Sequence, residues 1–197
     1  MKFKAQTEWV KPKEFPDLRF CDEIAIDLET QDPELKTMGS GSVVGKGKVV
    51  GIAVATEGYS GYFPFDHEGG GNLEKNKVIQ WFTDICKTTS TKIFHNAMYD
   101  VCWIRSMGIQ MWKVPSMYVG SYAERDAELT LNLWKIMQKE LSDQDLESIF
   151  NLETDLFPCL VDMRFLGVRV DVQKAHTLKK RLASEEEILL QKVEKET

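Results

Sequence analysis

A short apolar run that ends in acidic residues constrains this chain more than any other feature. Residues 23–28, EIAIDL, are rich in β-branched side chains and have the length of a buried strand. Side chains of a strand alternate between its faces, so Asp27 and Glu29 point to the same side. Two carboxylates on one face can bridge a cation, although a merely solvated strand end would carry the same pair.

The other apolar segments predict an α/β protein. Glu57 and Gly58 form a turn signal between two β-rich runs, which predicts a hairpin, and residues 31–47 have the composition of a loop. By periodicity we expect strands at 48–56, 59–65, 92–95 and 109–114, and helices at 73–88, 97–107, 117–140, 145–166 and 172–196. This order predicts a mixed five-stranded sheet flanked by helices and followed by C-terminal helices.

Length and composition exclude several classes of protein. The 197 residues, 43% of them hydrophobic, suffice for one core. No segment approaches the roughly 20 apolar residues that span a bilayer, and the N-terminus lacks the apolar core of a signal peptide. We therefore expect a cytoplasmic protein with no membrane partner. The four cysteines form no CxxC pair, which argues against zinc sites and a disulfide framework.

The net charge of −6 is unusual for a nucleic-acid-binding chain, which normally has a basic excess. Two bound divalent cations would bring this charge to about −2. Even then the chain offers no broad basic surface, so we do not expect strong non-specific binding to duplex DNA.

A second acidic motif, HNAMYD, joins the strand expected at 92–95 to the next helix. Asn96 stands at the N-cap position, and Asp100 lies one turn into the helix. Both residues also have purely structural explanations, because Asn is a good helix cap and the helix dipole favours an acid in the first turn.

The third motif, YAERD, places Tyr122 and Asp126 four residues apart, and therefore on one face of a helix. A phenol beside a carboxylate can orient a water molecule. A tyrosine packed at a helix edge next to a solvated acid is the alternative.

Taken together, the three motifs predict a metal site. One strand and two helices can bring Asp27, Glu29, Asp100 and Asp126 to one point at the end of the sheet. Four converging carboxylates cannot all remain ionised without cations, because like charges raise the pKa of each group. A pair of Mg²⁺ or Mn²⁺ ions would resolve this repulsion and is the usual arrangement for phosphodiester cleavage.

These residues resemble the motifs of a known family. The segments IAIDLET, IFHNAMYD and YAERD are similar to the three exonuclease motifs of the DEDD superfamily, in the subclass whose third motif carries a tyrosine. Residues 146–171 resemble the link between the exonuclease and the polymerase in family A DNA polymerases, and residues 61–67 resemble the third strand of those exonucleases. The resemblance implies a ribonuclease H-like 3′→5′ exonuclease domain at 1–142. It implies a linker helix and the start of a thumb-like helix at 143–197.

The resemblance also implies a role for each matching residue. The four acids would hold two divalent metal ions, and Tyr122 would position the attacking water. Thr30, Asn96 and Leu28 would contact the 3′-terminal nucleotide, although Leu28 is more typical of a core position. The substrate would be the single-stranded 3′ end of DNA, and the partner would be a polymerase domain of the same parent chain.

The chain departs from the family pattern in one place. Only 21 residues separate Asp100 from Tyr122, where the family usually has a longer stretch with another helix. We expect that a segment is absent between Pro115 and Ser116. The uncapped helix at the C-terminal end also suggests that the natural protein continues or that this helix packs on a partner.

Three alternatives remain open at this point. A stand-alone DEDD exoribonuclease would use the same acids. An inactive exonuclease fold retained as a structural spacer would bind no pair of ions. An acidic interaction module would carry the motifs by coincidence.

Overall fold

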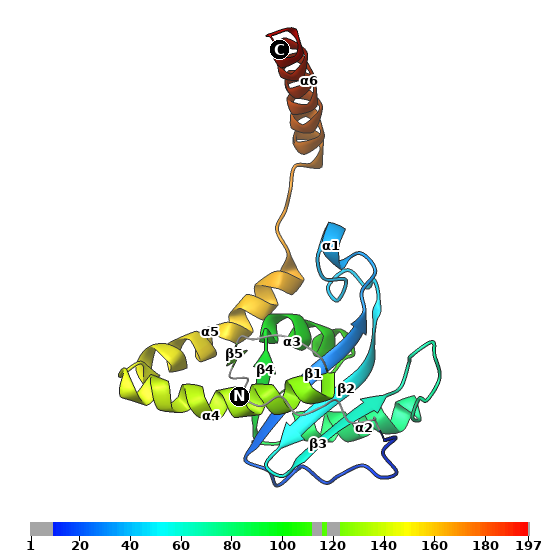
Figure 1. The fold of residues 1–197 in the computed structure, drawn as a ribbon, viewed down its shortest axis with the longest axis vertical. Coiled ribbons are helices and arrows are strands. Elements are labelled where there is room, and N and C mark those ends of the chain that lie inside the picture. The colour runs from blue at the N-terminus through cyan, green and yellow to red at the C-terminus, as the bar shows by residue number, and fades with distance from the viewer. Residues whose placement is uncertain (1–9, 112–115, 118–122, 197) are drawn as a thin grey trace. The chain divides into compact units, whose positions relative to one another are not determined.

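The computed structural model describes residues 10–111, 116–117 and 123–196, and its elements are labelled in Figure 1. Its strands form one mixed sheet in the order β3-β2-β1-β4-β5. β2 is antiparallel to β1 and β3, whereas β4 is parallel to β1 and β5. The strands span Glu23–Gln31 (β1), Lys48–Thr56 (β2), Tyr59–Pro64 (β3), Thr91–His95 (β4) and the short pair Ser116–Met117 (β5). The predicted α/β architecture is confirmed.

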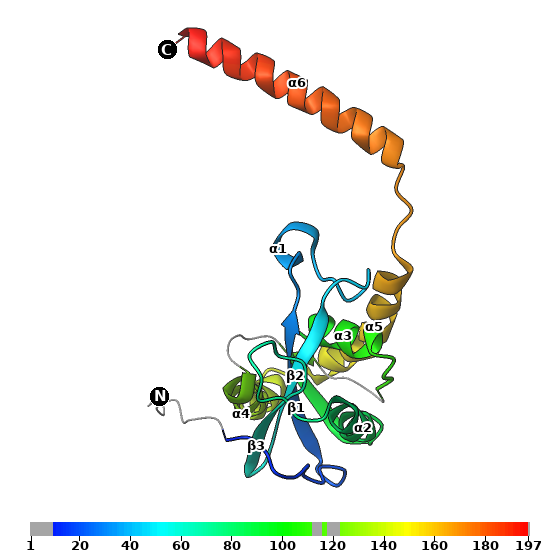
Figure 2. The same ribbon diagram turned by 90° about the vertical axis from the view of Figure 1, so that its right-hand side faces the viewer.

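Helices cover both faces of this sheet, as Figure 2 shows for α2 (Lys75–Cys86) and α4 (Ala123–Asp143). The face of α2 also receives α3 (Ala97–Ser106), and the larger core forms there. Alternate residues of β1 point into this core, namely Ile24, Ile26 and Leu28. They pack in one cluster with three aromatic residues of the neighbouring elements: Phe63, Phe82 and Phe94. The other residues of β1, including Asp27, therefore face α4.

The α4 face is built from small side chains. Ala25, Ala53 and Ala55 of β1 and β2 are fully buried against Ala127 and Leu131 of α4. Alanines let a helix approach a sheet closely, and Trp134 closes the far end of this interface. Its indole Nε1 donates a hydrogen bond of 2.6 Å to the Glu23 carboxylate. The small residues thus set how near α4 comes to the acids of β1.

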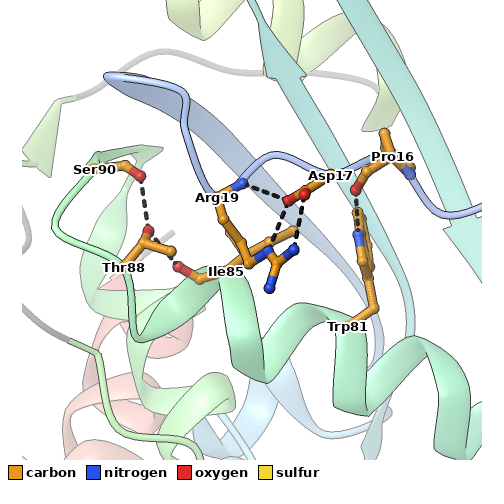
Figure 3. Close-up of polar contacts among 7 residues, drawn as sticks. All are labelled: Pro16, Asp17, Arg19, Trp81, Ile85, Thr88 and Ser90. Atoms are coloured by element: carbon orange, nitrogen blue, oxygen red, sulfur yellow. Dashed lines mark hydrogen bonds and ion pairs between the residues drawn. The ribbon is translucent and has the colours of Figure 1, made fainter.

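The N-terminal segment packs on the opposite face, along α2 (Figure 3). The Trp81 indole donates a 2.8 Å hydrogen bond to the carbonyl oxygen of Pro16. The Phe15 ring lies 5.5 Å from the Trp81 ring and 5.8 Å from the Phe63 ring. An exposed ion pair between Arg19 and Asp17 follows in the chain. These contacts hold the irregular lead-in against the core without bringing it to the acidic face.

Several element boundaries differ from those expected. β1 continues to Gln31, and the predicted loop at 31–47 contains the short helix α1 (Leu35–Met38). A strand was expected at 109–114. This prediction is wrong for residues 109–111, which are not in a strand, and residues 112–115 lie outside the described residues. The fifth strand is instead β5, because Ser116 and Met117 pair with Phe94 and His95. Met117 is therefore in a strand, not in a helix, and α4 begins at Ala123.

The C-terminal helices fall in two compact units. α5 (Glu147–Leu166) packs Phe157 and Val161 into the larger core, and the Arg105 guanidinium pairs with Asp162. The chain divides between Phe165 and Leu166. The second unit contains α6 (Val172–Glu196), which confirms the predicted helix. The functional assignment of 143–197 stays a prediction. No described helix has both the length and the apolar composition that a membrane span requires.

The close approach of α4 can be tested at Ala53. Replacing this fully buried residue by leucine inserts three carbons between β2 and α4 and should reduce the free energy of unfolding by about 1–3 kcal/mol. Urea denaturation followed by circular dichroism measures the change. Ala183→Leu on the exposed surface of α6 is the matched control and should alter stability by less than about 0.5 kcal/mol. Equal stability of both variants would contradict the proposed tight interface.

Candidate active site

Three predicted acids lie on the α4 face of the sheet. Asp27 and Glu29 project from β1, and Asp126 lies in the first turn of α4, next to Ala127 of the alanine interface. Asp126 is 7% exposed. Burial, with the charges of Asp126 and Glu29, raises the pKa of Asp27 from 3.8 to about 7. The three carboxylates are therefore close enough to repel one another.

The fourth acid is Asp100, which belongs to α3 on the other side of β1. The pairing of β1 with β4 ends at Ile26 and Phe94. Two residues further along β1, the backbone N–H of Leu28 donates a 3.1 Å hydrogen bond to Oδ1 of Asp100, which is 3% exposed. Burial and the neighbouring Asp27 raise the pKa of Asp100, and the hydrogen bond from Leu28 opposes this shift. This backbone contact thus adds to the pairing of β1 with β4 in joining the second motif to the first.

The structure brings all four predicted acids together, and their chemistry fits hard cations. Carboxylate oxygens are the preferred ligands of Mg²⁺ and Mn²⁺. The raised pKa values of Asp27 and Asp100 show that negative charge is in excess at this position. Within the described ranges, however, no three His, Cys, Asp or Glu side chains are arranged to hold one ion.

The residues expected to contact substrate behave differently from one another. Asn96 takes the N-cap position of α3 in a left-handed conformation, with φ 55° and ψ 51°, and its exposed side chain makes no capping hydrogen bond. The side chain of Asn96 therefore does not act as a hydrogen-bonding cap of α3. Thr30 shares a 2.7 Å hydrogen bond between its hydroxyl and that of Tyr99.

Leu28 has a core position. Its side chain is 6% exposed and packs in the larger core. The substrate contact that the resemblance implied for this residue stays a prediction. Its contribution to the site comes from the backbone N–H that reaches Asp100. Tyr122 lies outside the described residues, and its role stays a prediction.

Sequence reasoning missed one polar residue near the acids, Tyr62 of β3. Tyr62 is in register with Ala53, which is in register with Asp27, so the three share one row across the sheet. Burial, with the charges of Glu29 and Asp27, raises the pKa of Tyr62 above its usual range. The strand alternation in residues 59–64, read together with the hairpin register, would have placed this phenol on the acidic face.

Comparisons with known proteins relate the chain to phage replication proteins. No family model matches it. It is 28% identical over 248 residues to a DNA-directed DNA polymerase of Pseudomonas phage M6, covering 94% of this chain and 37% of that protein. DNA polymerase DpoZ of Salmonella phage PMBT28 is 38% identical over 64 residues, which cover 32% of this chain and 10% of DpoZ. The matched region thus covers little more than a third of the length of the M6 polymerase, and a tenth of the length of DpoZ.

Solved structures show the fold. Brucella melitensis NrnC bound to pGG has a TM-score of 0.55 and 13% sequence identity, over 77% of this chain and 90% of NrnC. NrnC with bound Mg²⁺ has a TM-score of 0.54 over the same shares, also at 13% identity. The chain therefore shares the fold of NrnC, in agreement with the predicted ribonuclease H-like sheet flanked by helices. In sequence, the chain is similar to part of a phage DNA polymerase.

The matched region of the M6 polymerase also differs in length from this chain. The 248 aligned residues exceed the 197 residues of the whole chain, so the relative contains residues inside the matched region that this chain lacks. The short spacing between Asp100 and Tyr122 agrees with such a difference.

The repulsion among the acids predicts a pH-dependent stability. Because the folded pKa of Asp27 is about 7 and its ordinary value is 3.8, the folded chain binds extra protons between about pH 4 and pH 7. Without divalent ions, the free energy of unfolding should therefore fall as the pH rises through this window. Asp27→Asn should remove about 1–3 kcal/mol of the difference between pH 5 and pH 8.

Urea denaturation at both pH values in a chelator measures this difference. Asp155→Asn, at an exposed position of α5, removes the same charge away from the site and should leave the pH dependence unchanged. A pH dependence that is identical in Asp27→Asn and the parent would mean that Asp27 is not under electrostatic strain.

Proposed function

We propose that this chain is a 3′→5′ exonuclease domain that removes 3′-terminal nucleotides from DNA by metal-dependent hydrolysis. The observation that carries the proposal is the hydrogen bond from Leu28 to Asp100, since it holds the acid of the second motif beside the strand that carries Asp27 and Glu29. The relation to phage DNA polymerases supports a proofreading role within such an enzyme. The resulting products would be nucleoside 5′-monophosphates.

Asp27, Glu29, Asp100 and Asp126 would hold a pair of Mg²⁺ or Mn²⁺ ions. Bound ions supply the activation of water and the neutralisation of charge that phosphodiester hydrolysis requires. The chain itself supplies the fixed position of these ligands, because β1, α3 and α4 hold their backbones rigidly in the core. Tyr122 would orient the attacking water from the residues that precede α4.

The 3′-terminal nucleotide would bind where β1 meets the N-terminus of α3. Asn96 offers an exposed amide there, and the linked hydroxyls of Thr30 and Tyr99 lie on the neighbouring elements. With a net charge of −6, the chain should have little affinity for duplex DNA. This low affinity is compatible with a site that accepts single strands. Mispaired 3′ ends melt more easily than paired ends, so such a site would select them.

Most of the affinity for DNA would come from a polymerase domain of the same parent chain. The M6 polymerase is much longer than its matched region, which supports this arrangement. Residues 143–197 would then provide the connection, with α6 as a thumb-like helix. A segment absent between Pro115 and Ser116 would account for the short spacing before Tyr122.

The activity can be tested with a 5′-labelled single-stranded DNA oligomer and Mg²⁺ or Mn²⁺. The parent chain should produce a ladder that shortens from the 3′ end, and Asp100→Asn should reduce the rate at least about 100-fold because a metal ligand is lost. Glu23→Gln is the matched control. Glu23 lies on the same face of β1, but its carboxylate is bound by Trp134 and Gln138. An active Asp100→Asn variant would place the chemistry elsewhere.

The same assay separates the alternatives. An RNA oligomer that is degraded faster than DNA of equal sequence would favour the exoribonuclease. A folded parent chain that degrades neither substrate and binds no Mn²⁺ would favour the structural spacer.

Asn96 can be tested without disturbing the fold. Glycine adopts the left-handed conformation freely, so Asn96→Gly removes the side chain while retaining the backbone at φ 55°. The free energy of unfolding should stay within about 0.5 kcal/mol of the parent. The KM for single-stranded DNA should rise about tenfold, because one hydrogen bond to the substrate is lost. Unchanged KM in this variant would limit Asn96 to a backbone role.

A further inference from the structure

Two lysines share one acid at the end of the sheet where β1 finishes. Asp66, in the loop that joins β3 to α2, forms ion pairs with Nζ of Lys48 at 2.8 Å and with Nζ of Lys75 at 2.7 Å. Every other ion pair between described side chains joins one basic group to one acidic group. One carboxylate cannot neutralise two ammonium groups, so positive charge is in excess at this position.

A β-bulge turns Lys48 toward the acidic face of the sheet. The register of β1 with β2 shifts by one residue between Glu29 and Thr30, so that Val50 has no partner on β1. Val49 then points into the larger core, and Lys48 points to the opposite face, which carries Glu29. Without the extra residue, strand alternation would turn Lys48 into the core. Bulges often re-aim side chains next to functional sites.

Both lysines are accessible beside the acids. Lys48 pairs with Gln31, which lies two residues beyond Glu29 and therefore about 7 Å further along the strand. The side chains of Lys48 and Lys75 are 38% and 54% exposed, so a ligand can reach their ammonium groups. Hydrogen bonds from Lys48 and Lys75 lower the pKa of Asp66 to about 2. Asp66 therefore stays ionised at neutral pH and holds both lysines in place.

The loop that carries Asp66 is itself fixed by hydrogen bonds. The backbone N–H groups of Phe65 and Asp66 donate to the carbonyl oxygen of Val50 at 2.9 and 3.1 Å, which ties the loop to the bulge. Further along, the N–H of His67 donates a 2.9 Å hydrogen bond to Oδ1 of Asn72, and Nδ2 of Asn72 donates a 2.8 Å hydrogen bond to the His67 carbonyl oxygen. The positions of the two lysines are thus set by the fold.

Two further charged side chains contact this part of the structure. Nζ of Lys11 donates a 2.9 Å hydrogen bond to the carbonyl oxygen of Asn72, which is a neutral partner. The carboxylate of Glu68 accepts a 2.9 Å hydrogen bond from Nε2 of Gln31. The three lysines therefore still outnumber the two acids, in a chain whose net charge is −6.

We propose that Lys48 and Lys75 bind backbone phosphates of the single strand whose 3′-terminal nucleotide lies at the acids. A phosphate supplies the second negative charge that two lysines and one carboxylate leave unmatched. Contacts to phosphates carry no sequence information, as the removal of any mispaired nucleotide requires. The lysines also offset the repulsion between the strand and the carboxylates of β1. The inference deepens the proposed function and rests on it.

Binding without cleavage tests this role. Fluorescence anisotropy of a 5′-labelled oligothymidylate is measured in a chelator at several salt concentrations. Lys48→Gln and Lys75→Gln should each weaken binding, and each should reduce the slope of log affinity against log salt by about 0.7, because one phosphate contact is lost. Lys48→Arg retains the charge and should bind as the parent does. An oligomer of abasic sites should show the same losses.

Lys135→Gln is the matched control, since it removes the same charge from a one-to-one ion pair with Glu57 near the opposite end of β2. It should leave both the affinity and the salt dependence unchanged. Thermal unfolding of each variant establishes that it is folded.

A neutral linkage in the oligomer locates the contact. A single methylphosphonate, moved along the strand, should weaken binding to the parent at one or two positions near the 3′ end. The same substitutions should have no effect on binding to the double variant Lys48→Gln/Lys75→Gln, because the partners of these phosphates are already removed. Effects that persist in the double variant would place the phosphates elsewhere and overturn the proposal.

The outcomes separate this inference from the proposed function. Binding that weakens in both lysine variants, in a parent chain without nuclease activity, would support the phosphate contacts and reject the exonuclease. An active parent whose affinity and salt dependence are unchanged in the double variant would overturn the phosphate contacts alone. A folded parent chain that binds no single strand, with or without bases, would also overturn them.

Discussion

The burial of acidic side chains on the central strand is the constraint around which this structure is arranged. β1 is flanked by β2 and β4 and covered on both faces, so Asp27 and Glu29 are only partly exposed to water. One face of β1 is occupied by Ile24, Ile26 and Leu28, and the other combines an alanine with carboxylates. Apolar packing on the first face holds the strand in place against the electrostatic cost of the second.

That cost is offset only in part by the protein. The N–H of Leu28 stabilises the ionised form of Asp100, but burial and the neighbouring carboxylates raise the pKa of Asp27 and of Asp100. A nearby positive charge would therefore stabilise the ionised forms of both acids. Glu23 shows the contrast on the same face of the strand, because Trp134 and Gln138 satisfy its carboxylate with hydrogen bonds. An acid with such partners is structural, and the acids near Asp27 are available for chemistry.

Local sequence patterns predicted most of the elements, and they failed where pairing over distance decides the outcome. β2 was predicted at its observed bounds, because the β-branched run at 48–56 is flanked by turn residues. β5 was misplaced, because a two-residue strand is defined by its pairing with Phe94 and His95 and has no periodicity of its own. The position of Tyr62 beside the acids was missed for a related reason. Its position depends on the register of three strands and on the space above Gly51.

By itself, the sequence determined which residues could perform the chemistry. The alternation of a strand put Asp27 and Glu29 on one side, and the order of strands and helices predicted that Asp100 and Asp126 would join them. The tertiary structure decided how the acids meet. β4 ends before Leu28, which frees a backbone N–H for Asp100, and small residues on β1 and β2 allow α4 to bring Asp126 close. Periodicity is a property of neighbours in the chain, whereas the fields that raise these pKa values arise between residues up to about a hundred positions apart.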